Sequence, residues 1–260
     1  MTQSRKSTIN SSIIIDTTSI DEIEERGCGL SSSSSYLNTP PTTPDLKRSI
    51  LDIINSEISY IQSPLMPNPS KIKVQPFTWD QIEFIVGSNQ LQVLARSKSE
   101  TKRYLQFKQD LKESNSNILD YLLHHELQWK DEDINNKETN KIFNMHTNDV
   151  KILYNKFPYY FEPNVYHLCI WSKNRMEVDI NSEEGDITDD MKNLIETYIN
   201  LTFVKGLNIP KENIVWFKNW GNLQSVKDIS HIHVLIKDDD GRVKPLIDQY
   251  LIGNTGVLFQ

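Results

Sequence analysis

Two histidines near the C-terminal end of the chain have the spacing of a shared site. His231 and His233 lie in the run SHIHVLIK, whose branched and apolar residues predict a β-strand. Side chains at i and i+2 of a strand point to the same face, so both imidazoles should lie side by side. Two such imidazoles can bind a metal, hold a phosphate or exchange protons. The alternative is that they are ordinary half-buried histidines bonded to the backbone.

A third histidine falls in a second predicted strand, VYHLCIWSK, over residues 165–173. Alternation places His167, Cys169, Trp171 and Lys173 on one face of it. If the two strands are neighbours, three histidines and a lysine converge, as a three-histidine zinc site would require. However, the sequence has no HExxH or other closely spaced metal signature. We therefore assign no metal and no cofactor.

A third predicted strand, NIVWFKN, and its flanks supply further candidates for ligand binding. Trp216, Lys218 and Trp220 alternate along it, and a lysine between tryptophans can stack on a sugar or base or hold a phosphate. Equally, the tryptophans could fill the core while the lysine reaches solvent. Ser225, in the next loop, could offer a hydroxyl to an anion.

The segment KFPYYFEP, residues 156–163, is rich in aromatic residues and proline. It could form one wall of a pocket, and it could equally be a rigid, packed connection.

The motifs of several enzyme classes are missing from the sequence. It contains no GxxxxGK[ST], no GxGxxG, no GxSxG and no kinase set. His231, His233 and His167 are therefore the candidates for general acid–base catalysis, but no nucleophile accompanies them and no catalytic residue is assigned.

The elements that must position these residues alternate between helices and strands. Apolar residues at helical spacing predict three short helices between residues 78 and 129 and a fourth over 186–206, in front of and between the strands. Thr78 and Gln81 form a capping-box pattern at the first helix. We expect a single α+β domain over residues 73–260, with N-terminal helices packed on a small, mainly antiparallel sheet.

Residues 1–72 have a different composition. A serine run at 31–35 and the string TPPTTP cannot bury enough apolar area to offset their ordering entropy, which predicts a disordered Ser/Thr/Pro-rich tail. Within it, isoleucines over 45–62 have helical spacing, so this segment could pack on the domain as a helix or dock a partner protein. Three residues precede proline and could be phosphorylated: Thr39, Thr43 and Ser63.

Charge and cysteine content limit the partners. The net charge of −7 disfavours binding to nucleic acid or to an anionic membrane surface. Two cysteines exclude a disulfide framework and suit a reducing compartment. No apolar run approaches the ~20 residues that span a bilayer, and the first residues lack a signal-peptide core. We expect a soluble protein of the cytoplasm and, as a second compartment, the nucleus.

Long strings of the sequence resemble one known family. KILYNKFPYYFEPNVYHLCIWSK and WFKNWGNLQSVKDISHIHV are the strongest parts of a likeness, over about residues 76–237, to the fungal N-acetylglucosamine-induced protein 1 family, a domain of unknown function. The resemblance implies an intracellular fungal protein that responds to this chitin-precursor sugar, and it supplies no established reaction. The family pattern includes these positions: His167, Trp171, Lys173, Trp216, Phe217, Asn219, Ser225, His231 and His233.

Three functions follow from these observations. The first is a regulatory protein of chitin-precursor metabolism that binds a phosphorylated sugar or nucleotide sugar, with Trp171 or Trp216 stacking on the sugar or base, and Lys173 and the histidines of 231 and 233 holding phosphate. The second is a hydrolase or transferase of phosphate esters that uses the histidine cluster. The third is a protein–protein interaction module that binds through residues 45–62. We favour the first because no complete catalytic set is visible.

Overall fold

A four-stranded antiparallel sheet organises the fold. The computed structural model describes residues 43–64, 66, 68–134 and 149–252. The sheet has the order β3-β4-β6-β5, and the bounds of its strands are β3 Val150–Tyr154, β4 Val165–Ser172, β6 Ser230–Lys237 and β5 Ile214–Phe217. The three strands expected from the sequence are β4, β5 and β6, and they are adjacent. This arrangement confirms the predicted α+β class.

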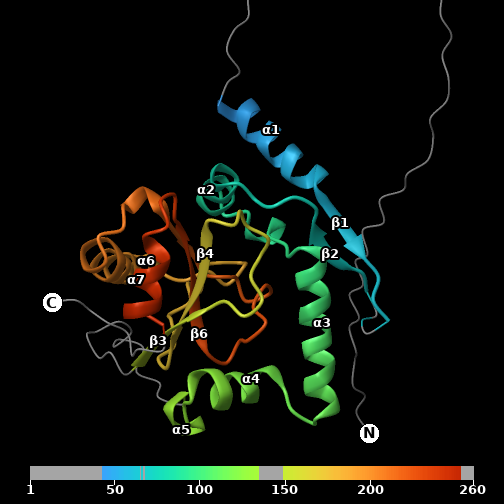
Figure 1. Ribbon diagram of the computed structural model, residues 1–260, viewed down its shortest axis with the longest axis vertical. Helices are drawn as coiled ribbons and strands as arrows, with labels where there is room; N and C mark the ends of the chain where they lie inside the picture. Colours follow the sequence, from blue (N-terminus) through green and yellow to red (C-terminus); the bar gives the residue numbers. More distant parts are fainter. Residues whose placement is uncertain (1–42, 65, 67, 135–148, 253–260) are drawn as a thin grey trace, which may run out of the picture. The chain divides into compact units, whose positions relative to one another are not determined.

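One face of the sheet is apolar and covered by helices. Helices α6, Asp189–Ile199, and α7, Val243–Tyr250, lie on this side (Figure 1), and a π-helical segment, η5 Asn200–Gly206, continues α6. The Thr188 side chain caps α6 by accepting a hydrogen bond from the Met191 backbone N–H. The buried layer contains residues from alternate strand positions and from both helices: Leu168, Ile170, Ile195, Ile199, Phe203, Ile232, Val234, Ile236 and Ile247.

The N-terminal helices cover the opposite face. They are α2 Trp79–Gly87, α3 Lys98–Glu113 and α4 Ile118–Tyr121, the last continuing as a π-helical turn, η2 Leu122–Leu127. Short elements complete the described part: η1 Leu91–Val93, α5 Asp131–Ile134 and η6 Lys211–Asn213. The capping box predicted at Thr78 and Gln81 is confirmed by both of its reciprocal hydrogen bonds.

The folded part begins earlier in the chain than residue 73. Helix α1, Thr43–Ser56, precedes a hairpin formed by β1 Ile58–Ile61 and β2 Ser70–Lys73. The predicted helix over 45–62 therefore ends at Ser56, because the following residues pair with β2 instead. Ile54 of α1 is fully buried in the same apolar cluster as α2. The expected tail N-terminal to residue 43, with Thr39, lies outside the described residues.

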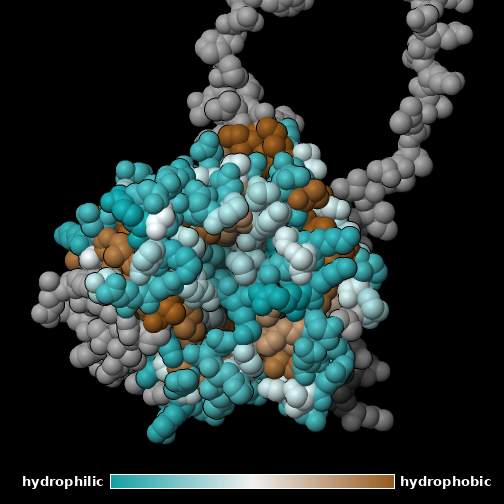
Figure 2. Space-filling model, in the orientation of Figure 1, coloured by the Kyte–Doolittle hydropathy of each residue, from teal (hydrophilic) through white to brown (hydrophobic). Residues whose placement is uncertain are grey.

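The surface in the view of Figure 2 is mainly hydrophilic. Hydrophobic residues gather over α1, where Ile53 is 51% exposed although its neighbour Ile54 is buried. Within the described ranges, no helix combines the length and apolar character needed to cross a membrane.

The contrast between these two neighbouring isoleucines tests whether α1 belongs to the folded domain. Ile54→Ala should lower the free energy of unfolding by about 3 kcal/mol, because it leaves a cavity in a packed core. Ile53→Ala is the matched control and should change it by less than about 0.5 kcal/mol. Urea denaturation of the full chain measures both. Equal effects of the two substitutions would show that α1 does not pack on the domain.

Candidate functional site

A cavity lies over the histidine-bearing face of the sheet. Its volume is about 160 Å³, and its walls come from β4, β6, α3, α4, η2 and the loops that follow β3 and β5. Aromatic rings dominate the lining, which includes Tyr104, Phe107, Tyr121, Phe157, Tyr159 and Trp171. Of the two alternatives for residues 156–163, the structure shows a cavity wall, since Lys156, Phe157 and Tyr159 line the cavity.

The floor of the cavity comes from the pairing of β4 with β6. Cys169 is directly opposite His233, and Trp171 is directly opposite His231. The Trp171 and His231 rings stack with their centroids 4.3 Å apart. The ring of Phe217 on β5 stacks on His233 at 4.8 Å. Each imidazole is therefore fixed by an aromatic ring on a neighbouring strand.

A chain of hydrogen bonds links two of the histidines and assigns their tautomers. Asn219 Nδ2 donates to His233 Nε2 at 3.1 Å, so His233 carries its proton on Nδ1. This Nδ1–H donates to His167 Nε2 at 2.9 Å, and Asn155 Nδ2 donates to the same His167 nitrogen at 3.1 Å. His167 is consequently protonated on Nδ1, which is buried and has no hydrogen-bond partner among the described residues.

His231 presents an unprotonated nitrogen to the cavity. Its Nδ1–H donates to the Ile229 carbonyl at 3.0 Å, which leaves a lone pair on Nε2. The ring lines the cavity, and the described part of the chain offers this Nε2 no hydrogen bond. His231 is therefore an acceptor at the cavity floor, and its donor is already used.

Burial keeps the floor uncharged at neutral pH. Desolvation lowers the pKa of His167 to about 3, with a further lowering by the positive charge of Arg96. Desolvation lowers the pKa of His231 to about 4, although the bond to Ile229 opposes the shift. The pKa of His233 falls well below 6.5, first through desolvation. Burial raises the pKa of the Cys169 thiol to about 12.

The positive charge of the site lies in its wall. The Arg96 guanidinium is within 4.5 Å of the Tyr104 ring centroid and 5.4 Å of the Tyr159 centroid, and its Nε donates to the Phe157 carbonyl at 2.8 Å. Within the described ranges Arg96 has no ion pair with a carboxylate. Lys156 in the same wall does have a carboxylate partner, since its Nζ lies 2.7 Å from Glu126 Oε1.

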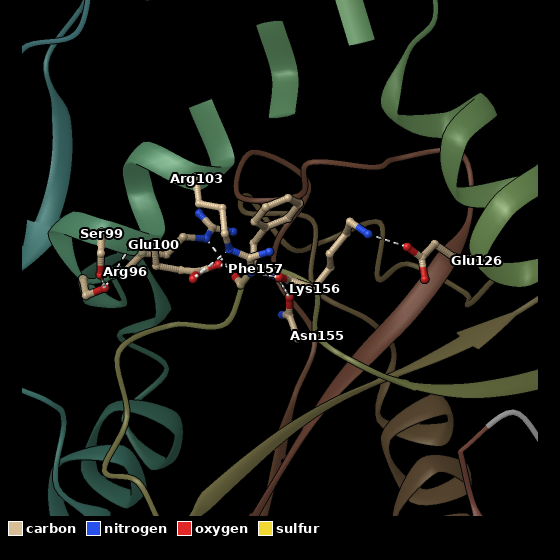
Figure 3. A network of polar contacts seen from close by, with 9 residues as sticks. Arg96, Ser99, Glu100, Arg103, Glu126, Asn155, Lys156 and Phe157 are labelled. Carbon is tan, nitrogen blue, oxygen red and sulfur yellow. Dashed lines mark hydrogen bonds and ion pairs between the residues drawn. The ribbon is translucent and has the colours of Figure 1, made fainter. Parts of the chain in front are cut away.

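A polar network holds the loop that carries this wall. Arg96 donates to the carbonyl of Phe157, and Arg103 donates to the carbonyl of Lys156 and to Glu100. Figure 3 shows the two arginines on one side of the loop and Lys156 extending to Glu126 on the other. Asn155 Oδ1 accepts the Phe157 backbone N–H at 2.9 Å. The loop is therefore tied to α3, to η2 and to the histidine floor.

The structure brings together most, but not all, of the site residues expected from the sequence. Trp171, Asn219, Ser225, His231 and His233 line the cavity. His167 does not line it, but its Nε2 is bonded to His233 Nδ1.

Three expected residues lie elsewhere. Trp216 is directly opposite Val234 in the sheet, so it projects to the helix-covered face and donates to Glu196 at 2.6 Å. Lys218 lines a separate depression with Trp216 and Asp186. Lys173 follows the end of β4 and lies over the Trp129 ring, 5.5 Å from its centroid. Of the two alternatives for Trp216, the structure shows the core position, and Phe217 lies on the histidine-bearing face instead.

The sequence interpretation missed Arg96, Tyr104 and Asn155. Arg96 precedes α3, Tyr104 lies within α3 and Asn155 follows β3, and none belongs to a local motif. A single arginine directly before the helix N-cap Ser97 was the available signal.

The fold and site together define a class: an α+β domain with a buried, neutral histidine cluster beneath an aromatic cavity. The chain belongs to the protein family of unknown function DUF3605, whose model matches residues 78–237. It is 46% identical over 239 residues to N-acetylglucosamine-induced protein 1 of Candida albicans, covering 86% of this chain and 91% of the relative. The resemblance inferred from the sequence is therefore confirmed.

Two further proteins are more distant. An uncharacterized Saccharomyces cerevisiae protein, YPL067C, is 29% identical over 65% of this chain and 83% of its own length. A solved structure described as the crystal structure of HTC1 aligns with a TM-score of 0.53 at 27% identity, covering 67% of this chain and 95% of that one.

The link between the loop and the histidine floor can be tested by stability. Asn155→Ala removes hydrogen bonds to His167 and to the Phe157 backbone, and we expect it to lower the free energy of unfolding by about 2 kcal/mol. The exposed Asn193 of α6 provides the control, since Asn193→Ala should change the value by less than about 0.5 kcal/mol. Urea denaturation gives both values, and equal effects would contradict the network described here.

Proposed function

We propose that this protein binds a small phosphorylated sugar in the cavity and acts in a regulatory role in the response to N-acetylglucosamine, within chitin-precursor metabolism. The observation that carries the proposal is Arg96, a half-buried guanidinium at the wall of an aromatic cavity without a carboxylate partner in the described structure. An unpaired charge removed from water is costly, and a bound phosphate would supply its counterion.

The charges in the structure favour other phosphate-binding residues than those expected from the sequence. His231 and His233 are neutral, and the proton of each is already used in a hydrogen bond. Lys173 does not line the cavity. The anion would therefore be held by Arg96, with Lys156 nearby in the same wall, rather than by the histidines and Lys173.

The remaining lining suits a sugar ring. Aromatic faces such as those of Trp171 and Tyr121 pack against the apolar faces of sugars. A hydroxyl group of a sugar could donate to His231 Nε2, whose lone pair is not used by a hydrogen bond in the described part of the chain. A cavity of about 160 Å³ is small for a ligand site, which favours a monosaccharide phosphate over a nucleotide sugar.

The name of the Candida albicans relative supports a role of this chain in the response to N-acetylglucosamine. That protein is named for induction by N-acetylglucosamine, and the alignment covers most of both chains. The name supports this role alone, and the choice of a phosphorylated form rests on Arg96.

The two other functions considered from the sequence receive less support. Catalysis at neutral pH favours a group whose pKa is near 7, whereas His231 has a pKa lowered to about 4. For the interaction module, Ile50, Leu51 and Ile54 of α1 pack against the domain's own core. A partner would therefore have to displace these contacts or use the exposed side of α1.

Arg96→Gln should weaken the binding of N-acetylglucosamine 6-phosphate by roughly 10- to 100-fold, because a charge-assisted hydrogen bond contributes about 1.5–3 kcal/mol. Isothermal titration of the full chain measures this change. Arg175→Gln is the matched control, since Arg175 is exposed and does not line the cavity, and it should bind as the wild type does.

The unphosphorylated sugar makes the test specific for the anion. N-acetylglucosamine itself should bind more weakly than its 6-phosphate to the wild type, and Arg96→Gln should reduce this difference. The proposal fails if the folded wild type binds neither sugar, or if Arg96→Gln binds the phosphate as tightly as Arg175→Gln does.

A further inference from the structure

A second site lies at the floor of the cavity, in residues that the proposed sugar binding does not use. His167 Nε2, Cys169 Sγ and His233 Nδ1 lie within 4.8 Å of one another, and all three side chains are buried. We propose that these three atoms bind a divalent transition metal ion of the zinc class. The inference does not rest on the sugar proposal.

The distances approach those of a tetrahedral zinc centre. Zn–N bonds of about 2.0–2.1 Å and Zn–S bonds of about 2.3 Å place two tetrahedral nitrogens roughly 3.3 Å apart and a nitrogen and sulfur roughly 3.6 Å apart. The separation between Cys169 Sγ and His233 Nδ1 is 3.6 Å, and the separation between the two imidazole nitrogens is 2.9 Å. The third pair, His167 Nε2 and Cys169 Sγ, lies within 4.8 Å, so a small opening of the two rings and an approach of the sulfur to His167 would complete the geometry.

The side-chain oxygen of Asn219, which has no hydrogen-bond partner among the described residues, is a second and separate indication of the metal site. To ligate through Nδ1, His233 must move its proton to Nε2, which then needs an acceptor. At present Asn219 Nδ2 faces that nitrogen at 3.1 Å, while Asn219 Oδ1 is buried without a partner among the described residues. Turning the amide over would let Oδ1 accept from His233 Nε2–H and from the Tyr159 hydroxyl. Such an outer partner is what a metal-bound histidine requires.

The donor set selects the class of ion. Two imidazole nitrogens and one thiolate suit zinc or cobalt, whereas calcium and magnesium take oxygen ligands. Binding would release the thiol proton of Cys169, and the thiolate would offset part of the charge of the ion near Arg96. Asn155 would give up its hydrogen bond to His167 Nε2. Because Cys169 and His233 line the cavity, a fourth ligand could enter from it.

Cobalt substitution tests the site without any sugar. The full chain would be stripped with a chelator and titrated with Co²⁺ in the Cys28→Ser background, where Cys169 is the one remaining thiol. We expect one equivalent to produce a thiolate-to-cobalt charge-transfer band and the intense visible bands of tetrahedral cobalt. Cys169→Ser should lose the charge-transfer band, while wild type and Cys28→Ser should have the same spectrum.

Two further measurements keep the inference falsifiable if Cys169→Ser does not fold. X-ray absorption of the zinc-loaded Cys28→Ser chain should show one sulfur and at least two imidazole nitrogens. Asn219→Leu should weaken cobalt binding by roughly 10- to 100-fold, with Asn219→Asp restoring it, because Asn219 is a positioning residue for His233. No stoichiometric band in folded Cys28→Ser, or a zinc shell without sulfur, would overturn the site and leave the sugar proposal untouched.

Discussion

The antiparallel pairing of β4 with β6 is the constraint on which the site depends. It places Cys169 opposite His233 and Trp171 opposite His231. The side-chain period of a strand is two, so a shift of β6 by one residue would turn His231 and His233 into the layer beneath α6. Ile232 and Val234 are fully buried in that layer, and the hydrophobic effect there fixes the register. The apolar face of the sheet thus determines the geometry of the polar one.

Desolvation then separates the uncharged floor of the cavity from its charged wall. A fully buried imidazole remains neutral because its cation would lose its hydration, so His167 and His233 can share a hydrogen bond without mutual repulsion. Arg96 cannot respond in the same way, because a guanidinium does not lose its proton in proteins. The tyrosine rings and the Phe157 carbonyl replace only part of its hydration. Under the proposed function, an anion bound in the cavity would supply the counterion of Arg96.

The sequence predicts what depends on local periodicity and misses what depends on pairing between distant segments. Alternation alone placed His231 and His233 on one face, and dense apolar runs identified β4 and β6. Alternation could not decide which face of β5 joins the histidines, because the register with β6 sets that choice, and both alternatives for Trp216 stayed open for this reason. Likewise, Ile58 and Ile61 fit the helical spacing of α1, but pairing with β2 overrides that local preference.

The walls of the cavity were even harder to predict from the sequence, because they depend on contacts between distant segments. Arg96 and Asn155 are separated along the chain, and both bond to Phe157 because the loop after β3 lies against the segment before α3. No spacing rule predicts such a contact, and the aromatic composition of the loop allowed a cavity wall only as one of two alternatives. The three atoms of the proposed metal site share this property, since His167 and His233 are 66 residues apart and a motif search examines only neighbours.

The two proposed ligands would not act independently. A divalent ion at the floor would add positive charge beside Arg96, in a partly desolvated cavity where charges interact more strongly than in water. It would therefore increase the affinity of the cavity for a phosphate group. By thermodynamic linkage, the phosphate would increase the affinity for the ion by the same factor. The neutral histidines would then serve two purposes: without metal they keep the floor uncharged, and with metal they make anion binding dependent on the ion.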